Sequence, residues 1–262
     1  MTLGNHSFRD RFLAGDALFG TFLKVPATMP AEIFGSIGYD FVVVDEEHAP
    51  FNRETTDRIV LACRAAGIAA IVRVQNSDPA NILSVLDCGA DGVLVPHVRD
   101  AATAQAVVAA GRYRAGKRGF APTTRAGGFG SAGQADHMAA EDRRVTIIAM
   151  IEDPEAIDNI DEIVAVEGLD GVFIGRGDLA AAYAGSEDAA ALVQAATSSV
   201  HAAAAKVGRT VAILPGKPED AAFQARSGST VFILSSDQGF LRAAAMEAHS
   251  VMANAIDQEM KD

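Results

Sequence analysis

Acidic side chains follow two apolar segments of this chain at places that suit a divalent metal ion. Glu152 comes directly after the run 146–151, and Asp178 follows the run 171–174 after a glycine turn. If these runs are neighbouring parallel strands, their carboxyl ends bring the two carboxylates together. Carboxylates are ligands that Mg²⁺ and Mn²⁺ prefer, and such a site keeps positions open for a 2-oxo acid. The alternative is a pair of solvated acids, with Asp178 capping the next helix.

A second reactive group follows an earlier apolar run. Asp45 and His48 lie three residues apart, directly after residues 41–44. A carboxylate in this position can hold the imidazole in one tautomer and make it a general base. Glu46 and Glu47 are equally available as partners of His48, and the spacing does not choose among the three acids.

Arg73 closes the very apolar run 68–72. An arginine at the end of a buried strand needs an anionic partner. One interpretation is a structural ion pair with Glu152 or Asp45. The other is contact with a substrate oxygen on which negative charge develops. The sequence leaves both open.

The turn 175–178 combines two glycines with the start of a helix. Gly175 and Gly177 permit close approach of the backbone, and N–H groups at a helix start can hold a carboxylate or a phosphate. The signal is weak, because glycines in a tight turn need no ligand. Arg176 is either a second contact for an anion or a solvated side chain.

The elements that must position these residues are eight short apolar runs separated by helical stretches. The runs are continuous rather than alternating, which is typical of parallel strands covered on both faces. Strands are expected at 18–23, 41–44, 69–74, 92–95, 146–151, 171–174, 210–214 and 230–234. Helices are expected at 30–36, 54–66, 79–88, 101–111, 154–166, 188–207, 218–226 and after Asp237. This α/β alternation predicts a (β/α)8 TIM barrel, in which residues after the strands converge on one mouth.

A glycine-rich stretch at 112–144 interrupts the alternation and shows no clear strand. Because it follows the fourth strand, where catalytic loops of a barrel lie, it predicts a functional loop or a partner-contacting insert. No repeat or linker divides the chain, so residues 1–262 are expected to form one domain.

Composition excludes several classes of function. The chain has 262 residues, 49% of them hydrophobic, and a net charge of −12 that argues against nucleic acid or a membrane surface as the main partner. Cys63 and Cys88 lie in helical stretches and predict free thiols rather than a disulfide framework. No apolar run reaches about 18 residues, and the first residues lack a signal-peptide core, so a cytoplasmic protein is expected.

Five segments together resemble the HpcH/HpaI family of metal-dependent (class II) 2-oxo-acid aldolases. They are GYDFVVVDEEHAP (38–50), VRV (72–74), LDCGADGVLVP (86–96), IE (151–152) and VEGLDGVFIGRGDL (166–179). The resemblance extends from about residue 20 to 237. The family includes 4-hydroxy-2-oxoheptanedioate aldolase and 2-keto-3-deoxy sugar-acid aldolases, so the resemblance implies a barrel of the phosphoenolpyruvate/pyruvate-binding type.

The resemblance also implies roles for individual residues. Glu152 and Asp178 would bind the divalent metal (Mg²⁺, Mn²⁺ or Co²⁺). Arg73 would contact the keto oxygen of pyruvate and steady its enolate, and His48, oriented by Asp45, would move protons.

Further implications concern the substrate pocket and the assembly. The turn 175–178 would hold the pyruvate carboxylate through backbone N–H groups, and Phe173 and Leu214 would lie near the aldehyde pocket. The family is typically a homo-hexamer built as a dimer of trimers, with the last helix packed on a neighbouring subunit.

The predicted reaction is reversible cleavage of a 4-hydroxy-2-oxo acid to pyruvate, or a related 2-oxo acid, and an aldehyde through a metal-stabilised enolate. A lysine Schiff base would serve the same chemistry, but only Lys24 directly follows a strand. The alternatives are a citrate-lyase-like acyl-CoA lyase and a non-catalytic barrel that binds an oxo acid.

Three departures from the family pattern concern the acceptor. Gly-Arg-Gly-Asp stands at 175–178 where Gly-Pro-(Ser/Ala)-Asp is usual, and His97 stands where an apolar residue is common. The loop 118–130 resembles only a subset of members. These differences do not affect the residues assigned to pyruvate, but they leave the identity of the aldehyde substrate open.

Overall fold

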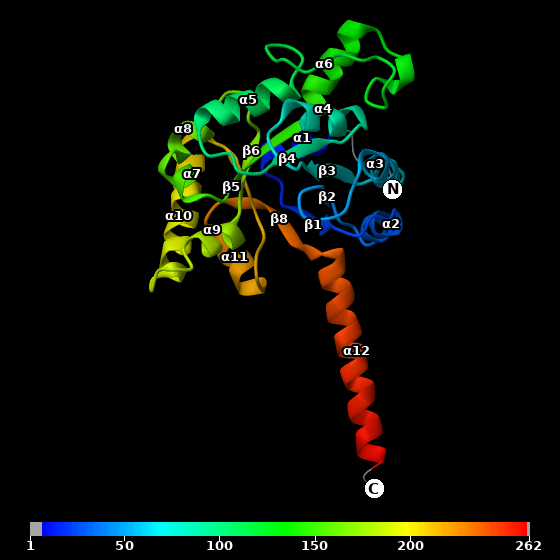
Figure 1. Ribbon diagram of the computed structural model, residues 1–262, viewed down its shortest axis with the longest axis vertical. Coiled ribbons are helices and arrows are strands. Elements are labelled where there is room, and N and C mark those ends of the chain that lie inside the picture. Colours follow the sequence, from blue (N-terminus) through cyan, green and yellow to red (C-terminus); the bar gives the residue numbers. More distant parts are fainter. Residues whose placement is uncertain (1–6, 261–262) are drawn as a thin grey trace.

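The structure is a computed structural model that describes residues 7–260, and it is built around a closed barrel of eight parallel strands in sequence order (Figure 1). The predicted TIM barrel is therefore confirmed. The strands are β1 Leu18–Leu23, β2 Phe41–Asp45, β3 Ala69–Arg73, β4 Gly92–Val95, β5 Thr146–Ile151, β6 Gly171–Ile174, β7 Thr210–Ile213 and β8 Ser229–Ser236.

Helices surround the barrel and account for the other expected elements. They are α1 Phe8–Ala14, α2 Met29–Ser36, α3 Arg53–Ala66, α4 Pro79–Asp87, α5 Ala101–Gly111, α6 Gln134–Arg144, α7 Pro154–Asp158, α8 Ile160–Val164, α9 Arg176–Ala182, α10 Ala189–Val207, α11 Pro218–Arg226 and α12 Asp237–Glu259. A proline occupies the first turn of α4, α7 and α11, where its missing N–H costs nothing. The single helix expected at 154–166 is two short helices, α7 and α8, which meet at Asn159.

Two hydrophobic layers explain why the strands are apolar throughout. One set of strand side chains fills the barrel interior, and the other packs against the surrounding helices. At the N-terminal end of the barrel, Phe12 of α1 is fully buried and lies where a side chain at Gly171 would have to stand. The helix α1, which the sequence analysis did not anticipate, thus closes the end of the barrel opposite the mouth.

Three aspartates hold the N-terminal ends of the strands together. Asp40, Asp91 and Asp170 directly precede β2, β4 and β6, and each accepts a backbone N–H from the start of the preceding strand. The donors are Phe19 (2.8 Å), Ala70 (2.9 Å) and Ile147 (2.8 Å). Each aspartate also pairs at 2.7 Å with an arginine, respectively Arg11, Arg144 and Arg112. Every charge in this arrangement is compensated.

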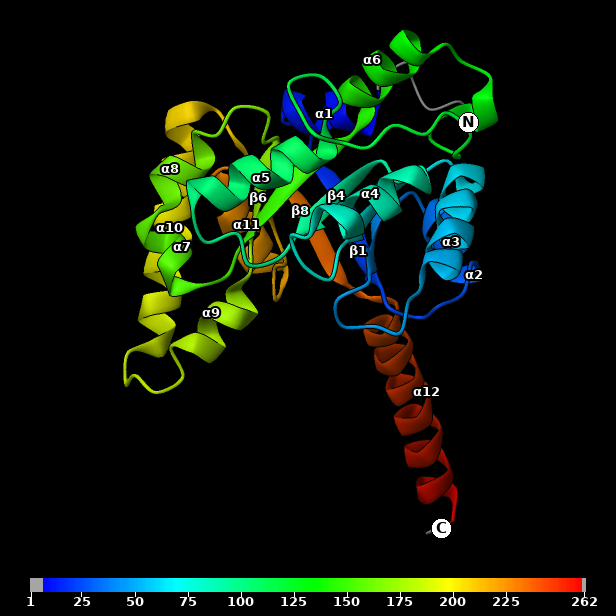
Figure 2. The same cartoon turned by 45° about the horizontal axis from the view of Figure 1, so that its top comes forward.

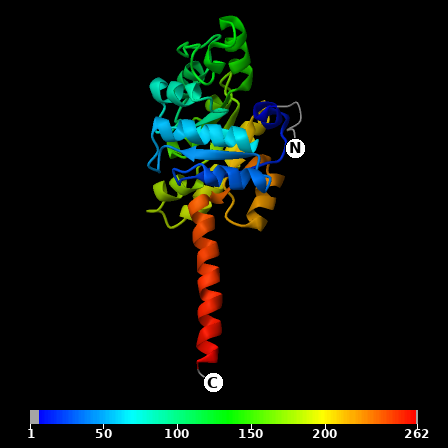
Figure 3. The ribbon, with the colours of Figure 1, turned by 90° about the vertical axis from the view of Figure 1, so that its right-hand side faces the viewer.

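Two segments lie outside the regular barrel (Figures 2 and 3). Residues 112–144 carry no strand, as expected, but they contain a short 3₁₀ turn at Gly128–Gly130 and the helix α6. The long helix α12 leaves the barrel at the mouth and projects from the body, with only Asp237 of its residues buried. Within residues 7–260, no helix is long and apolar enough to cross a bilayer.

Candidate active site

A pocket of about 230 Å³ opens at the C-terminal ends of the strands. Arg73 at the end of β3 and the turn 175–178 after β6 contribute its polar groups. Its apolar walls are Phe22, Met150, Phe173, Ile174 and Leu214. The structure thus brings together seven of the residues singled out from the sequence: Arg73, Phe173, Gly175, Arg176, Gly177, Asp178 and Leu214.

Glu152 lies directly beside this pocket, against Gly175. A Cβ atom at Gly175 would stand 2.5 Å from the Cβ of Glu152 and 3.0 Å from its Oε2, so only glycine fits there without displacing the carboxylate. The side chain is buried, and its Oε1 accepts the backbone N–H of His97 at 2.8 Å. This close packing of the β6–α9 turn fixes the position of the acid.

The electrostatic surroundings of Glu152 are negative. Burial raises the pKa of Glu152 to about 7; the backbone N–H and charge of His97 oppose the rise, whereas Asp178 and Glu47 add to it. Asp178 is exposed in the first turn of α9. Within residues 7–260 neither carboxylate has an arginine partner, and the basic group beside Glu152 is the ring of His97, whose Nδ1 lies 3.4 Å from Oε1.

The donor set fits a hard divalent cation that draws its other ligands from elsewhere. Within residues 7–260, no three or more His, Cys, Asp or Glu side chains gather in a way that could hold a metal ion. Glu152 and Asp178 supply two carboxylates, and Mg²⁺ is commonly bound through one or two carboxylates with water and substrate oxygens completing its shell. The residues present therefore suit such an ion.

Asp45 and Arg73 form a buried ion pair across β2 and β3, where they are register neighbours. Nε and Nη2 of Arg73 donate to the two oxygens of Asp45 at 2.9 and 2.8 Å, and Nζ of Lys24 lies 3.0 Å from Oδ2. Burial alone would raise the pKa of Asp45, but Arg73 and Lys24 outweigh it and lower the pKa. Asp45 therefore stays ionised and fixes the guanidinium of Arg73.

The geometry around His48 differs from the sequence expectation. Asp45 accepts the backbone N–H of His48 at 3.1 Å and does not reach its ring. The carboxylate beside the ring is Glu47, whose Oε2 lies 3.7 Å from Nε2. Asp45 instead pairs with Arg73 on the adjacent strand, because a buried guanidinium needs a counter-charge, whereas the imidazole of His48 is 57% exposed and can be solvated by water.

Glu47 is the residue whose importance the spacing could not reveal. Its carboxylate lies 3.2 Å from Nη1 of Arg73 and 3.8 Å from Nε2 of His97, in addition to its approach to His48. The run of three acids before His48 was the available signal, but only the fold separates them. Glu46 points instead to the hydroxyl of Thr56.

Arg176 is neither a solvated side chain nor free to meet an anion. Its guanidinium donates to both oxygens of Asp220 at 3.1 and 2.6 Å, and to the carbonyl of Leu214 at 2.7 Å. Asp220 also accepts the backbone N–H of Gly216. Arg176 thus ties the turn 175–178 to the loop after β7 and holds one wall of the pocket in place.

Residues 18–244 match the family model for HpcH/HpaI aldolase/citrate lyase. The chain is 33% identical over 241 residues to a 5-keto-4-deoxy-D-glucarate aldolase of Escherichia coli O6:H1, covering 91% of this chain and 93% of the relative.

Solved structures give the same assignment. An HpcH/HpaI aldolase/citrate lyase family protein from Burkholderia cenocepacia J2315 superposes with a TM-score of 0.87 at 27% identity, over 94% of this chain and 98% of that one. The citrate synthase SbnG superposes with a TM-score of 0.83 at 33% identity, over 96% and 99%. The family model and the aldolase relatives identify a carbon–carbon lyase. The chain belongs to the HpcH/HpaI aldolase/citrate lyase family.

Proposed function

We propose that the protein is a divalent-metal-dependent aldolase that reversibly cleaves a 4-hydroxy-2-oxo acid to pyruvate, or a related 2-oxo acid, and an aldehyde. The observation that carries the proposal is the buried carboxylate of Glu152, which faces Asp178 and Glu47 and has no arginine partner within residues 7–260. Arg73, a cation fixed by Asp45 and Glu47, lines the pocket that Glu152 adjoins. An acid without an arginine partner and a fixed cation at one pocket suit a keto acid bound at the mouth.

Glu152 and Asp178 would hold Mg²⁺ or Mn²⁺. When bound, such an ion acts as a Lewis acid toward the keto oxygen and favours the charge that bond cleavage places there. Arg73 lines the same pocket and is held rigidly by Asp45 and Glu47. Because its orientation is set before the substrate arrives, its charge stabilises the developing oxyanion without reorganisation.

The other groups of the mouth bind the substrate and move a proton. Backbone N–H groups of the turn 175–178 hold the carboxylate of the 2-oxo acid, and Phe173 and Leu214 line the way to the aldehyde. The exposed ring of His48, next to Glu47, takes the proton from the C4 hydroxyl in the cleavage direction. His97, 49% exposed and also next to Glu47, faces the acceptor side.

A Schiff base on Lys24 is disfavoured by the geometry of the mouth. Its ammonium group lies 3.0 Å from the buried carboxylate of Asp45, and attack on a carbonyl requires a neutral amine. An ammonium held by a buried acid is a poor nucleophile. Lys24 serves instead to hold Asp45, and through it Arg73.

A second candidate function is a reaction that makes or breaks citrate. It is favoured by the 33% identity to SbnG, whose solved structure is that of a citrate synthase. The metal-binding acids do not discriminate between the two reactions. Citrate formation or acyl-CoA cleavage in the absence of any pyruvate release would place this candidate first.

The assembly proposed for the enzyme is a homo-hexamer, a dimer of trimers in which α12 packs on a neighbouring subunit. The helix exposes large apolar side chains along its length, among them Leu241, Met246, Met252 and Ile256. Large apolar side chains exposed along a projecting helix favour contact with a partner chain. Light scattering on the full chain measures the assembly directly.

The function is tested by coupling pyruvate release to lactate dehydrogenase. The substrates are a panel of 4-hydroxy-2-oxo acids that includes 5-keto-4-deoxy-D-glucarate. The parent enzyme is assayed with Mn²⁺ and with EDTA, and the His48→Ala variant is assayed with Mn²⁺. We expect release that requires the metal and falls about 10²-fold in His48→Ala, because one general base typically contributes a factor of this size. Release that persists in EDTA would contradict the metal assignment and point back to a lysine.

A further inference from the structure

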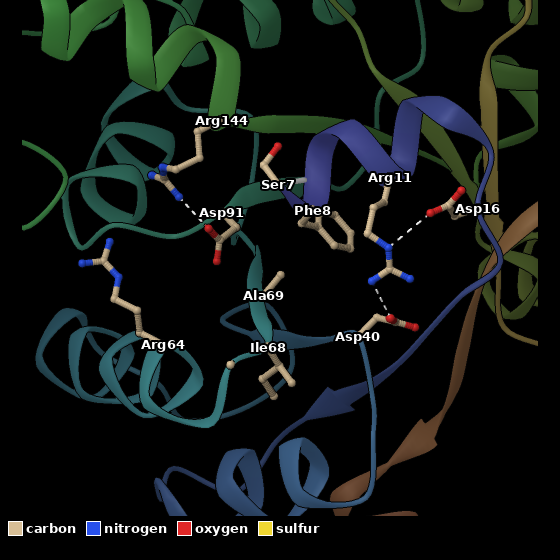
Figure 4. Close-up of a pocket in the computed structure, with 11 residues that line it drawn as sticks. Ser7, Phe8, Arg11, Asp16, Asp40, Arg64, Ile68, Ala69, Asp91 and Arg144 are labelled. Atoms are coloured by element: carbon tan, nitrogen blue, oxygen red, sulfur yellow. Dashed lines mark hydrogen bonds and ion pairs between the residues drawn. The ribbon is translucent and has the colours of Figure 1, made fainter. Parts of the chain in front are cut away.

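A second cavity, larger than the pocket at the mouth, lies at the opposite end of the barrel. It has a volume of about 540 Å³ and forms where α1 crosses the starts of β2, β3 and β4 (Figure 4). The ends of α3 and α6 complete its walls. None of the residues proposed for the aldolase reaction contributes to it, so it requires an explanation of its own.

One side of the cavity is apolar. Ile68 and Ala69, at the start of β3, and Phe8 of α1 present hydrocarbon to it. The ring of Phe8 is fixed by Phe12 and Phe41, with ring centroids 5.8 and 5.3 Å away. The apolar side is therefore preformed, as in most sites for small molecules.

The charges that line the cavity are paired with one exception. Asp16 and Asp40 both form ion pairs with Arg11, at 3.2 and 2.7 Å. Asp91 forms an ion pair with Arg144 at 2.7 Å. Arg64 lies near the end of α3 with an exposed side chain, and no hydrogen bond or ion pair joins its guanidinium to another residue within 7–260. It is the one unmatched charge of the lining within the described part of the chain.

Arg64 and Arg144 approach the same point of the wall. Nη2 of Arg64 lies 3.1 Å from the place that a Cβ of Gly89 would take, and Nη1 of Arg144 donates to the carbonyl of Gly89 at 3.4 Å. Figure 4 shows the two guanidinium groups on one side of the cavity, with Phe8 and Ile68 further along it. Arg64 thus lies beside the Arg144–Asp91 ion pair, next to an apolar floor formed by Phe8, Ile68 and Ala69.

We propose that this cavity binds a small organic carboxylate with an apolar body. Arg64 would take the carboxylate through its planar fork of N–H groups, next to Arg144, and the apolar body would cover Phe8, Ile68 and Ala69. Inorganic phosphate would leave the floor exposed to water, and a neutral compound would make no ion pair with Arg64. Asp16, Asp40 and Asp91 already form ion pairs with arginines, so the ligand needs no ammonium group.

The test is a calorimetric titration of the full chain with 3-phenylpropionate, 3-phenylpropan-1-ol and inorganic phosphate. We expect 3-phenylpropionate to saturate with a Kd of about 1 mM or tighter, and the other two to bind at least about 10-fold more weakly. Equal binding of the alcohol would overturn the role of the charge. Equal binding of phosphate would overturn the role of the floor.

Variants locate the site, because the mouth also has groups that attract carboxylates. Arg64→Gln is expected to lower the affinity for 3-phenylpropionate at least about 10-fold, since it removes a charge-assisted contact. Arg58→Gln, which removes the same charge from the same helix at a side chain paired with Glu54, is the matched control and should bind like the parent. Pyruvate release should be unchanged in both. Undiminished binding in Arg64→Gln, or no saturation by about 10 mM in the parent, would overturn the proposal.

Discussion

Two buried glutamates at opposite ends of the barrel show opposite electrostatics. Glu152 at the mouth and Glu141 at the end of α6 are 3% and 4% exposed. Burial raises the pKa of Glu152 to about 7. Burial alone would raise the pKa of Glu141 too, but Arg144 and Arg118 outweigh it and lower the pKa.

The difference lies in the partners and not in the depth. Nε and Nη2 of Arg144 donate to the two oxygens of Glu141 at 2.8 and 3.0 Å, and Arg118 adds a third contact at 3.2 Å. Glu152 has only the backbone N–H and the ring of His97. The N-terminal end matches each acid with an arginine and serves stability, whereas the mouth leaves an acid unmatched and available to a cation.

The largest expected effect separates the two glutamates by activity. Glu152→Gln should lower pyruvate release about 10³-fold, because it removes a charge that a bound cation needs. Glu141→Gln should change the activity of the folded enzyme less than about twofold. The two variants are compared by the coupled assay at saturating Mn²⁺. Comparable losses in both would break the distinction between the two ends.

The next effect separates them by stability. At neutral pH, Glu141→Gln should lower the free energy of unfolding by about 3 kcal/mol, because Arg118 and Arg144 lose their buried counter-charge. Urea unfolding of the parent and the variant measures the difference. Glu162→Gln, on the exposed face of α8, is the control and should have an effect within about 0.5 kcal/mol.

This difference should depend on pH in a stated direction. The pKa of Glu141 is lower in the folded chain than its ordinary value of 4.5, so its contribution is present above that value and fades as pH falls through the folded pKa. The stabilities of parent and Glu141→Gln should therefore converge below about pH 4. A gap that stays constant from pH 7 to pH 3.5 would show that Glu141 acts by packing and not by charge.

A smaller effect sharpens the account of the mouth itself. Gly175→Ala should lower activity about 10-fold or more, because the added Cβ would meet Glu152 at 2.5 Å and displace the carboxylate. Gly185→Ala, in the exposed loop between α9 and α10, should change activity less than about twofold, since nothing lies within 4 Å of a Cβ there. Initial rates with Mn²⁺ decide the comparison. Equal tolerance at both positions would mean that Glu152 need not be held where it lies.

The barrel could be predicted from the sequence because its strands are buried on both faces. Continuous apolar runs such as 146–151 and 171–174 stand out against polar loops, and Pro79, Pro154 and Pro218 mark helix starts. The helix α6 could not be predicted, because its buried face consists of His137 and Glu141 and shows no apolar period. The segment 112–144 therefore looked like a loop throughout.

The convergence of Arg73 and the 175–178 turn on one pocket could also be predicted, because both follow strand ends. The ion pair of Arg73 with Asp45 was one of the interpretations of the sequence, and the structure shows it between register neighbours on β2 and β3. The pairing of Arg176 with Asp220 could not be predicted, because the two residues are far apart in sequence and meet only when β6 and β7 align. Sequence spacing carries no information on that contact.

The central claim is that the mouth binds a divalent cation through an acid the protein leaves unmatched. The most direct measurement is calorimetric titration of the metal-stripped enzyme with Mn²⁺, alongside Glu152→Gln and Glu141→Gln. The account predicts saturable binding near one ion per subunit in the parent and in Glu141→Gln, and at least about 10² weaker binding in Glu152→Gln. Unchanged Mn²⁺ affinity in Glu152→Gln, or equal loss in Glu141→Gln, would contradict it.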